Sequence, residues 1–438
     1  MIAELVKMKG NVSGIDIGSE KIFIATSKDD EVVNYDTYTE SYKRAIEYLK
    51  SKEIQSIVIE ATGIYWIAFF ELLESAGFEV YVVNGKHVKN VPGRKTDVLD
   101  CQWLRTLHSY GLLRASFIPP QNIRALRSYV RLRDDNIGLG SQHIQHIQKA
   151  LELMNIKINN VISHITGVSG IKILKSIIAG ETDAWKLLEL CDKSKKDKKQ
   201  KEVLESLKGN FRQEHIFLLK QALEGWEFYQ RRLGECDTEI EKLLKEMTKD
   251  KEEIKTKGPS KRNNSPNRMK IESLHSLLLK LTGGKDAEKV VGIGDTMLIQ
   301  LTSEIGINLS AWKTEKHFTS WLGLAPRVNR SGKGRKRKKD KINTRAGQLF
   351  KIAVQGIAKS KGTALCGFYR RIKSKHGAMV ANKATARKLA VMYYNIMTKG
   401  IEYVEVGLKK YQEKYEQQRL KFLIKQASSF NLKLVPAI

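Results

Sequence analysis

Residues 11–26, Asn-Val-Ser-Gly-Ile-Asp-Ile-Gly-Ser-Glu-Lys-Ile-Phe-Ile-Ala-Thr, carry the pattern that decides the fold of the first part of this chain. They predict two apolar strands, 11–17 and 21–26, joined by a Gly-Ser-Glu turn. A third short β-rich run follows over residues 31–38. Short strands separated by polar turns predict a three-stranded meander.

The residues that follow alternate between helical and strand patterns. Apolar residues at a helical period predict a helix over 42–50, and 66–76 predicts a second one. The runs 56–61 and 78–83 are almost wholly apolar, as is typical of strands buried on both faces. A further helix begins near Thr96. This order of elements is that of a ribonuclease-H-like fold, an α/β domain with a mixed sheet.

The rest of the chain is predicted to be helical. Apolar residues recur at helical spacing from Gln121 onward and again over 217–247, which predicts long antiparallel helices, partly coiled-coil. We interpret this middle region as an elongated spacer. A run of Lys and Asp occupies 193–201, and the polar, Pro- and Asn-containing stretch 249–270 is typical of a linker. A second compact domain is predicted from Ile271.

The stretch Val290-Val-Gly-Ile-Gly294, which leads into a predicted helix over 296–305, resembles a helix-hairpin-helix turn. Such glycines let backbone amides approach a phosphate, and the N-terminus of a helix adds a partial positive charge. A plain tight turn between two helices explains the same residues equally well.

The composition narrows the class of partner. Lys and Arg number 77 against 48 Asp and Glu, a net charge of +29, which attracts polyanions, most commonly nucleic acid. An apolar content of 41% excludes a wholly disordered chain, and no uncharged apolar run approaches the roughly 18 residues of a membrane span. The N-terminal residues lack a signal-peptide core. The four cysteines are far apart, which argues against disulfides or structural zinc and fits a reducing cytoplasm: Cys101, Cys191, Cys236 and Cys366.

Two acidic residues lie in apolar strands. Asp16 is inside Gly14-Ile-Asp-Ile-Gly18, and Glu60 ends Ile57-Val-Ile-Glu60. A buried charge costs several kcal/mol unless it is paired or bound to a metal, and neither strand carries a nearby basic residue. If the two strands are neighbours in one sheet, both carboxylates meet at one edge.

A second acidic pair follows in the helix predicted from Thr96. Asp97 and Asp100 are three residues apart and therefore share one helix face. Four converging carboxylates repel one another unless hard cations neutralise them, and oxygen-only ligands favour Mg²⁺ or Mn²⁺. Two such ions about 3.5–4 Å apart activate the attacking oxygen and stabilise the leaving oxygen in phosphoryl transfer. Each acid alone has a structural explanation, as a turn or helix cap; together, Asp16, Glu60, Asp97 and Asp100 predict a catalytic metal site.

A basic loop provides the other candidate chemistry. Between Ser331 and Arg345 lie eight basic residues and one acid, Asp340, a density suited to phosphate contact. Ser331 is the only hydroxyl between Ser320 and Thr344, and a serine flanked by arginines can attack a phosphodiester. A structural serine in a Gly-rich loop and a nuclear-import signal are the alternatives. The predicted nucleic-acid contacts are Arg327, Arg330, Lys333, Arg335, Lys336, Arg337, Lys338, Lys339, Lys341 and Arg345.

These motifs resemble a known family. Gly-Ile-Asp-Ile-Gly (14–18), Ile-Glu-Ala-Thr-Gly-Ile-Tyr-Trp (59–66) and Lys-Thr-Asp-Val-Leu-Asp-Cys-Gln-Trp-Leu (95–104) are similar to the DEDD-type RuvC domain of the insertion-sequence one-ten family of transposases. Trp-Leu-Gly-Leu-Ala-Pro-Arg-Val-Asn-Arg-Ser-Gly-Lys (321–333) resembles that family's C-terminal transposase domain. With this resemblance, we expect a RuvC-like DEDD domain over 1–120, a helical coiled-coil region with a basic linker over 121–270, a mainly helical transposase domain over 271–405 and a helical tail over 406–438.

The resemblance implies a bridge-RNA-guided DNA recombinase of a mobile insertion sequence. In such enzymes an RNA encoded beside the gene pairs with donor and target DNA. By this likeness the four carboxylates hold Mg²⁺, and Ser331 is the nucleophile that forms a phosphoserine-DNA intermediate. Dimers pair into a tetramer, with carboxylates and serine coming from different protomers. A cytoplasmic, nucleoid-associated prokaryotic protein is implied. Gly-Lys-Gly after Ser331, in place of the frequent Gly-Gly-Lys, departs slightly from the family pattern.

Three other functions compete with this one. In a RuvC-type structure-specific nuclease, water would be the nucleophile and Ser331 would only bind the DNA backbone. The stretch Asp16-Ile-Gly-Ser19 also resembles a phosphate loop of actin-like ATPases, although the charge of +29 and the Asp97 and Asp100 pair argue against that function. A non-catalytic nucleic-acid scaffold would account for the basic loop and long helices.

Overall fold

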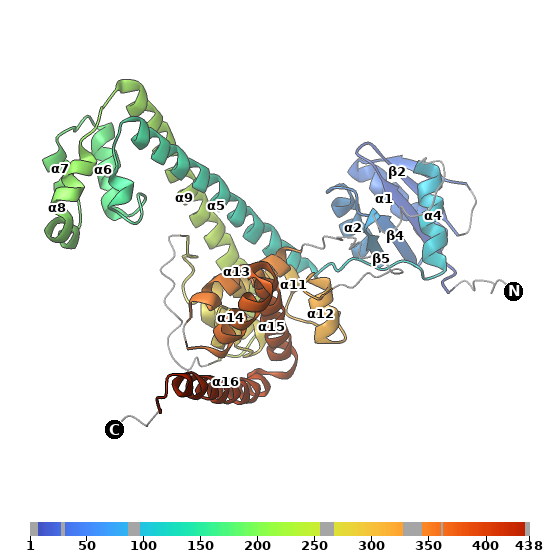
Figure 1. Ribbon diagram of the computed structural model, residues 1–438. Helices are drawn as coiled ribbons and strands as arrows, with labels where there is room; N and C mark the ends of the chain where they lie inside the picture. Colours follow the sequence, from blue (N-terminus) through green and yellow to red (C-terminus); the bar gives the residue numbers. More distant parts are fainter. Residues whose placement is uncertain are drawn as a thin grey trace, which may run out of the picture. The chain divides into compact units, whose positions relative to one another are not determined.

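The computed structural model describes residues 8–27, 31–85, 97–254, 267–326, 344–360 and 362–433, with the backbone alone at 97, 193–198 and 401–412. The chain forms two compact units, Met1–Ile118 and Pro119–Ile438. Figure 1 shows the first as a sheet with helices and the second as entirely helical in its described part.

The first unit is built on a five-stranded mixed sheet of order β3-β2-β1-β4-β5. β1 pairs antiparallel with β2, which pairs antiparallel with β3, whereas β4 runs parallel to β1 and to β5. The predicted meander and mixed sheet are confirmed. The strands are β1 (Val12–Ile17), β2 (Lys21–Thr26), β3 (Val33–Asp36), β4 (Ser56–Glu60) and β5 (Glu79–Val83).

Helices cover both faces of this sheet (Figure 1). α1 (Thr39–Ser51) and α2 (Trp66–Ser75) pack on one face, in a core that contains Ile15 and Ile59. On the other face, α4 (Asp97–Ser109) packs through Leu104 against Val58. Because side chains alternate along a strand, β1 and β4 each divide their residues between the two helical layers. The helices predicted over 42–50 and 66–76 and from near Thr96 are confirmed.

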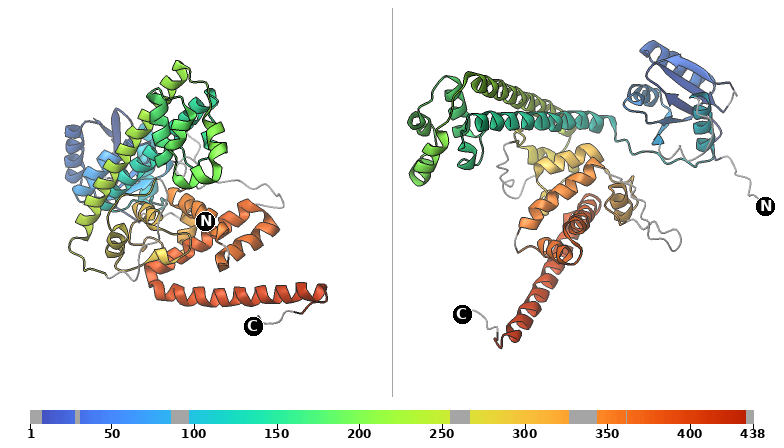
Figure 2. Two further views of the ribbon diagram at one scale, coloured as in Figure 1. Left: turned by 90° about the vertical axis from the view of Figure 1, so that its left-hand side faces the viewer. Right: turned by 45° about the horizontal axis from the view of Figure 1, so that its top comes forward.

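In the second unit, two long antiparallel helices lie side by side, α5 (Gln121–Leu153) and α9 (Gln213–Thr248) (Figures 1 and 2). Their far ends carry a small helical subdomain with its own apolar core, which the sequence pattern did not reveal. The Lys- and Asp-rich run belongs to this subdomain as the start of a helix. Its elements are η1 (Ile158–Asn160), α6 (Val168–Ile178), α7 (Ala184–Glu189) and α8 (Lys193–Leu207).

A buried ion pair joins the two long helices. Arg133 on α5 is 1% exposed, and its Nε donates to Asp237 Oδ1 on α9 over 2.5 Å. Both side chains of the pair also make hydrogen bonds to the backbone. Arg133 Nη2 donates to the carbonyl oxygen of Asn267 (3.0 Å), and Asp237 Oδ2 accepts from the backbone N–H of Lys270 (2.8 Å). These contacts fix the chain leading into the C-terminal helices against the helix pair.

The remaining helices form a C-terminal body around an aromatic core, in which the Phe318 ring packs near those of Phe350 and Tyr393. None of the helices in the described ranges combines the length and apolar character needed to cross a bilayer. The elements of this body are α10 (Leu274–Thr282), η2 (Ala287–Lys289), α11 (Asp295–Ile305), α12 (Glu315–Trp321), α13 (Arg345–Lys359), α14 (Ala364–His376), α15 (Ala378–Lys399) and α16 (Ile401–Ser429).

Candidate active site

The register of β1 and β4 brings two of the predicted carboxylates together. Ile15 on β1 is paired with Ile59 on β4, so the same offset sets Asp16 beside Glu60. Since Ile15 and Ile59 face the α1 and α2 layer, the alternation of side chains turns Asp16 and Glu60 toward the face that α4 covers. Both acids are partly exposed there, at the carboxyl end of their strands.

Helix α4 lies directly on β1. An added Cβ at Gly14 would come within 2.3 Å of both the carbonyl oxygen of Cys101 and the backbone nitrogen of Arg105. The guanidinium of Arg105 donates to the carbonyl oxygen of Thr26 on β2 over 2.8 Å, which fixes the helix along the sheet. Asp100 precedes Cys101 in the chain, and α4 begins at Asp97, so this close contact holds the first turns of α4 over β1.

The electrostatics place the Asp16 carboxylate near this helix. Burial, followed by the negative charge of Asp16, raises the pKa of the Cys101 thiol to about 12. The thiol therefore stays protonated at neutral pH, and its sulfur donates to the carbonyl oxygen of Val98 (3.1 Å).

The Glu60 carboxylate lies against the chain that follows β5. A Cβ at Gly85 would come within 2.0 Å of Glu60 Oε1 and 2.8 Å of its Cδ. The backbone N–H of Ala61 donates to the carbonyl oxygen of Val83 (2.8 Å), so the pairing of β4 with β5 continues past Glu60. Only a residue without a side chain at position 85 leaves room for this carboxyl group.

The structure brings three of the four predicted acids to one side of the sheet. Asp16 and Glu60 turn toward the face that α4 covers, and Asp100 stands on α4 one helical turn before Leu104, which packs on that face, whereas the side chain of Asp97 lies outside the described residues. These three do not converge as tightly as ligands of one ion. Among the described residues, one group of three possible metal ligands has its ligand atoms within 4.8 Å of one another. It lies in the second unit and consists of His275, Glu288 and Asp295. The donor chemistry at the sheet edge still fits a hard divalent cation.

The predicted serine and most of the predicted basic contacts lie outside the described residues. They are Ser331 with Arg327, Arg330, Lys333, Arg335, Lys336, Arg337, Lys338, Lys339 and Lys341. The residues on either side of this segment are in contact. Thr344 Oγ1 donates to the carbonyl oxygen of Leu322 (3.3 Å) and accepts from the backbone N–H of Gly347 (3.0 Å), which caps α13. The end of α12 and the start of α13 are thereby joined.

Comparison with known families decides what this chain is. Residues 13–156 match the transposase family model of the DEDD IS110 type, and residues 286–360 match that of the IS116/IS110/IS902 transposase family. The chain belongs to the IS110 family of transposases. It is therefore an enzyme that acts on DNA in transposition, with a RuvC-like first domain. No individual curated protein matches it.

The first match covers all four predicted carboxylates of the transposase, and the second covers Ser331. A transposase domain of the DEDD type indicates chemistry with a divalent metal ion. The carboxylate oxygens of Asp16 and Glu60 at the sheet edge are donors that suit such an ion.

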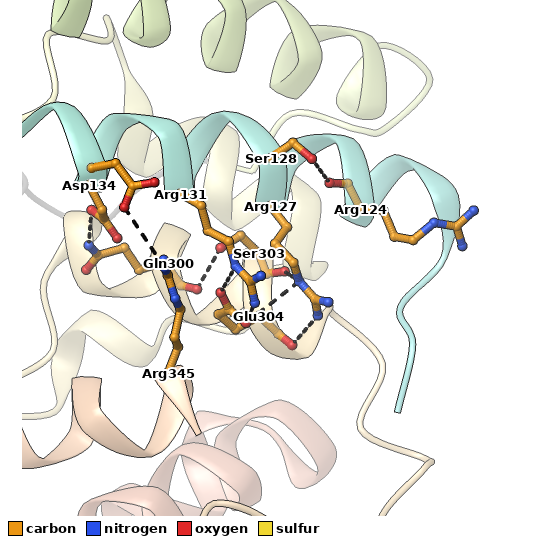
Figure 3. A network of polar contacts seen from close by, with 10 residues as sticks. Arg124, Arg127, Ser128, Arg131, Asp134, Gln300, Ser303, Glu304 and Arg345 are labelled. Atoms are coloured by element: carbon orange, nitrogen blue, oxygen red, sulfur yellow. Dashed lines mark hydrogen bonds and ion pairs between the residues drawn. The ribbon is translucent and has the colours of Figure 1, made fainter. Parts of the chain in front are cut away.

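Arginines of α5 hold the C-terminal body of the transposase in place (Figure 3). Arg131 binds both carboxylate oxygens of Glu304 on α11 (2.7 and 2.8 Å), and Arg127 donates to the carbonyl oxygens of Ser303 and Glu304 (3.0 and 2.8 Å). Our sequence prediction treated this stretch only as an apolar helical stripe. Basic residues at positions 124, 127 and 131 share one helix face, and that spacing was the available signal.

Arg345 is the one predicted nucleic-acid contact that the structure describes. Its Nη2 lies 4.0 Å from Asp135 Oδ1 on α5, and half of its side chain is exposed. The neighbouring Asp134 accepts from Gln300 Nε2 (2.9 Å), and burial raises the pKa of its carboxyl group. The start of α13, directly after the serine-bearing segment, is therefore placed against α5 and α11 (Figure 3).

The predicted glycine turn directly precedes α11. Gly292 has φ of +98°, and a Cβ there would come within 2.8 Å of Ile357 on α13, so the turn needs glycine. Gly294 is the N-cap of α11, and Asp295 is its first residue. Two carboxylates, those of Glu288 and Asp295, lie close to this helix terminus. Phosphate binding at this turn stays a prediction.

Proposed function

We propose that this transposase cuts and rejoins DNA strands through a covalent phosphoserine-DNA intermediate at Ser331, with Mg²⁺ held by Asp16, Glu60, Asp97 and Asp100 and with an element-encoded bridge RNA as guide. The observation that supports it most is the presence of both family matches on one chain, one over the carboxylates and one over the serine-bearing segment.

The carboxylates would act together on one phosphate. Asp16 and Glu60, side by side on β1 and β4, and Asp100 on α4 present oxygens from three elements to the same side of the sheet. A bound Mg²⁺ supplies charge neutralisation for the phosphate under attack and for the departing oxygen. The carboxylates would hold the ion at a defined position on the sheet edge. The close contact between Gly14 on β1 and the backbone of α4 limits how far the carboxylates of the strands can move from those of the helix.

The serine step is a substitution at phosphorus. The Ser331 oxygen forms a bond to phosphorus and loses its proton, while the bond from phosphorus to a deoxyribose oxygen breaks and that oxygen takes up a proton. The new phosphoester keeps the bond energy of the original one, so a hydroxyl of another strand can reverse the step and rejoin DNA. Arg327 and Arg330 would stabilise the charge that develops on the phosphate. The joined ends of α12 and α13 give the segment a fixed base.

The net charge of the chain and its division into two units indicate its nucleic-acid and protein partners. A net charge of +29 suits binding of both donor and target DNA and of the guide RNA. The carboxylates belong to the first unit, and Ser331 is more than two hundred residues further along the chain. We propose that dimers pair into a tetramer in which one protomer supplies the carboxylates and another the serine, so that a single subunit does not cut DNA.

The test is a search for a covalent protein–DNA adduct that survives denaturation. The full chain would be incubated with DNA of the element's end, the flanking transcript and Mg²⁺, as wild type, Ser331→Ala, Asp16→Asn and the control Ser320→Ala, which changes an exposed serine on α12. We expect an RNA-dependent adduct in the wild type and the control only. DNA cleavage without an adduct, retained in Ser331→Ala, would instead show a RuvC-type nuclease in which water attacks.

A further inference from the structure

We infer that His275, Glu288 and Asp295 form a second metal site in the C-terminal body, for a divalent ion that accepts both imidazole nitrogen and carboxylate oxygen, such as Mn²⁺ or Zn²⁺. This site shares no residue with the predicted carboxylates of the first unit and does not depend on the serine chemistry.

The three side chains come from three consecutive elements. His275 lies on α10, Glu288 on η2 and Asp295 on α11. The imidazole Nδ1 is 2.9 Å from Asp295 Oδ1 and 3.1 Å from Glu288 Oε2, and the three atoms lie within 4.8 Å of one another. Ligands about 2.1 Å from one ion stand roughly 3 Å apart when they are neighbours in its coordination shell. The observed spacing is that of ligands prepared for a shared ion.

The charge of the group also favours a cation. The side chains of Glu288 and Asp295 are only 7% and 17% exposed, and a third carboxylate, that of Asp286, lies 3.9 Å from Nε2 of His275. Like charges held together away from water are costly unless a cation neutralises them. A direct hydrogen bond between His275 Nδ1 and Asp295 Oδ1 is the metal-free explanation of the same geometry, and the experiment below separates the two.

An open cavity gives an ion access to these ligands. It is lined by His275, Glu288 and Asp295 together with Gly292 and Gly294 of the glycine turn. The donor set is mixed, with one nitrogen and two oxygens. Mg²⁺ prefers oxygen ligands alone, whereas Mn²⁺ and Zn²⁺ also accept an imidazole nitrogen. The mixed ligands of this site therefore favour Mn²⁺ or Zn²⁺ over Mg²⁺.

A bound ion would have two effects on this part of the molecule. It would tie α10, η2 and α11 together at one point, and it would neutralise the charge of the two ligating carboxylates at the N-terminus of α11. The second effect matters because the glycine turn predicts phosphate contact there, and carboxylates at that terminus repel phosphate.

The experiment measures Mn²⁺ binding to the full chain in the Asp16→Asn/Glu60→Gln background, which removes ligands of the predicted carboxylate site. Free Mn²⁺ is followed by electron paramagnetic resonance, without DNA or RNA. We expect one bound ion per chain, displaced by Zn²⁺, and at least tenfold weaker binding when Glu288→Gln or Asp295→Asn is added. His317→Ala is the matched control, because its imidazole pairs with the hydroxyl of Thr314.

Thermal unfolding supplies a second readout. Mn²⁺ should raise the melting temperature of the background protein more than that of the Glu288→Gln variant at the same Mn²⁺ concentration. Absence of bound Mn²⁺ in the background protein would overturn the inference, as would equal binding after Asp295→Asn in a protein with unchanged circular dichroism. Because Ser331 takes no part in this measurement, its outcome is separate from that of the proposed recombination.

Discussion

Gly14 on β1 lies directly beneath the backbone of Arg105 on α4, so closely that a Cβ at position 14 would come within 2.3 Å of the Arg105 nitrogen. This contact sets the distance between β1, which carries Asp16, and α4, which carries Asp97 and Asp100. The smallest residue of the strand therefore determines how closely carboxylates from two elements approach one another.

The first prediction concerns this contact. Gly14→Ala should push α4 away from β1, because both atoms that the methyl group meets belong to backbone and cannot rotate aside. We expect a loss of roughly 1–3 kcal/mol in the free energy of unfolding, as for overpacked cores. DNA cleavage should fall at least tenfold. Gly10→Ala is the control, since a Cβ there meets nothing within 4 Å; equal cleavage by the two variants would contradict the argument.

The second prediction tests the position of Glu60. A methyl group from Gly85→Ala would meet the Glu60 carboxyl group at 2.0 Å and turn it away. Since this neighbour is the end of a side chain, the fold should tolerate the change with a loss below about 1–2 kcal/mol. Cleavage should nevertheless fall, and raising the Mg²⁺ or Mn²⁺ concentration should restore part of it. Urea unfolding and cleavage assays on one preparation would separate these effects, and unchanged cleavage would count against a role for Glu60.

The third prediction concerns the buried pair of Arg133 and Asp237. Asp237→Asn leaves the Arg133 guanidinium buried without its counter-charge, so we expect a loss of about 3–5 kcal/mol in the free energy of unfolding. The double variant Arg133→Met/Asp237→Leu should recover much of that loss, because two apolar side chains leave no buried charge. Chemical denaturation of the wild type, Arg133→Met, Asp237→Leu and the double variant forms a complete cycle. A double variant as unstable as the sum of its single variants would show no coupling between the two side chains and would contradict this prediction.

The fourth prediction is a pH dependence in the first unit. His108 is 3% exposed, and its Nε2 is 2.8 Å from Ser56 Oγ. Burial, followed by the charge of Lys9, lowers the pKa of His108 from 6.5 to about 4. At a pH between these two pKa values, His108 binds a proton in the unfolded chain but not in the folded chain. The free energy of unfolding is therefore highest above about pH 6.5 and decreases as the pH falls toward 4. At pH 5 the loss is about 2 kcal/mol.

Hydrogen exchange in β4 and β5, corrected for the intrinsic pH dependence of exchange, would measure this loss. His108→Gln should lose less stability than the wild type between pH 7 and pH 5. The exposed His164→Gln is the matched control. A wild-type profile that stays flat over this interval would exclude His108 as the titrating group.

Local patterns of residues were enough to predict most strands and long helices of this protein. Alternating and continuous apolar runs predicted each strand of the sheet, and the 3.6-residue period predicted α1, α5 and α9, because these patterns depend on neighbours along the chain. It also singled out Asp16 and Glu60, since an acid within an apolar strand is visible without knowing the partner strand. The Lys- and Asp-rich start of α8 could not be assigned this way, because its apolar partners, among them Val203 and Leu207, come later in the helix.

Contacts between residues far apart in the chain could not be predicted from these patterns. Leu132 is exposed and its neighbour Arg133 is buried, the reverse of their polarity, because Asp237 lies opposite on α9. The approach of Arg105 to Gly14 and the meeting of His275, Glu288 and Asp295 likewise depend on how elements pack across the chain. Residue patterns report which face is buried, whereas the identity of the neighbour on that face is set by long-range packing.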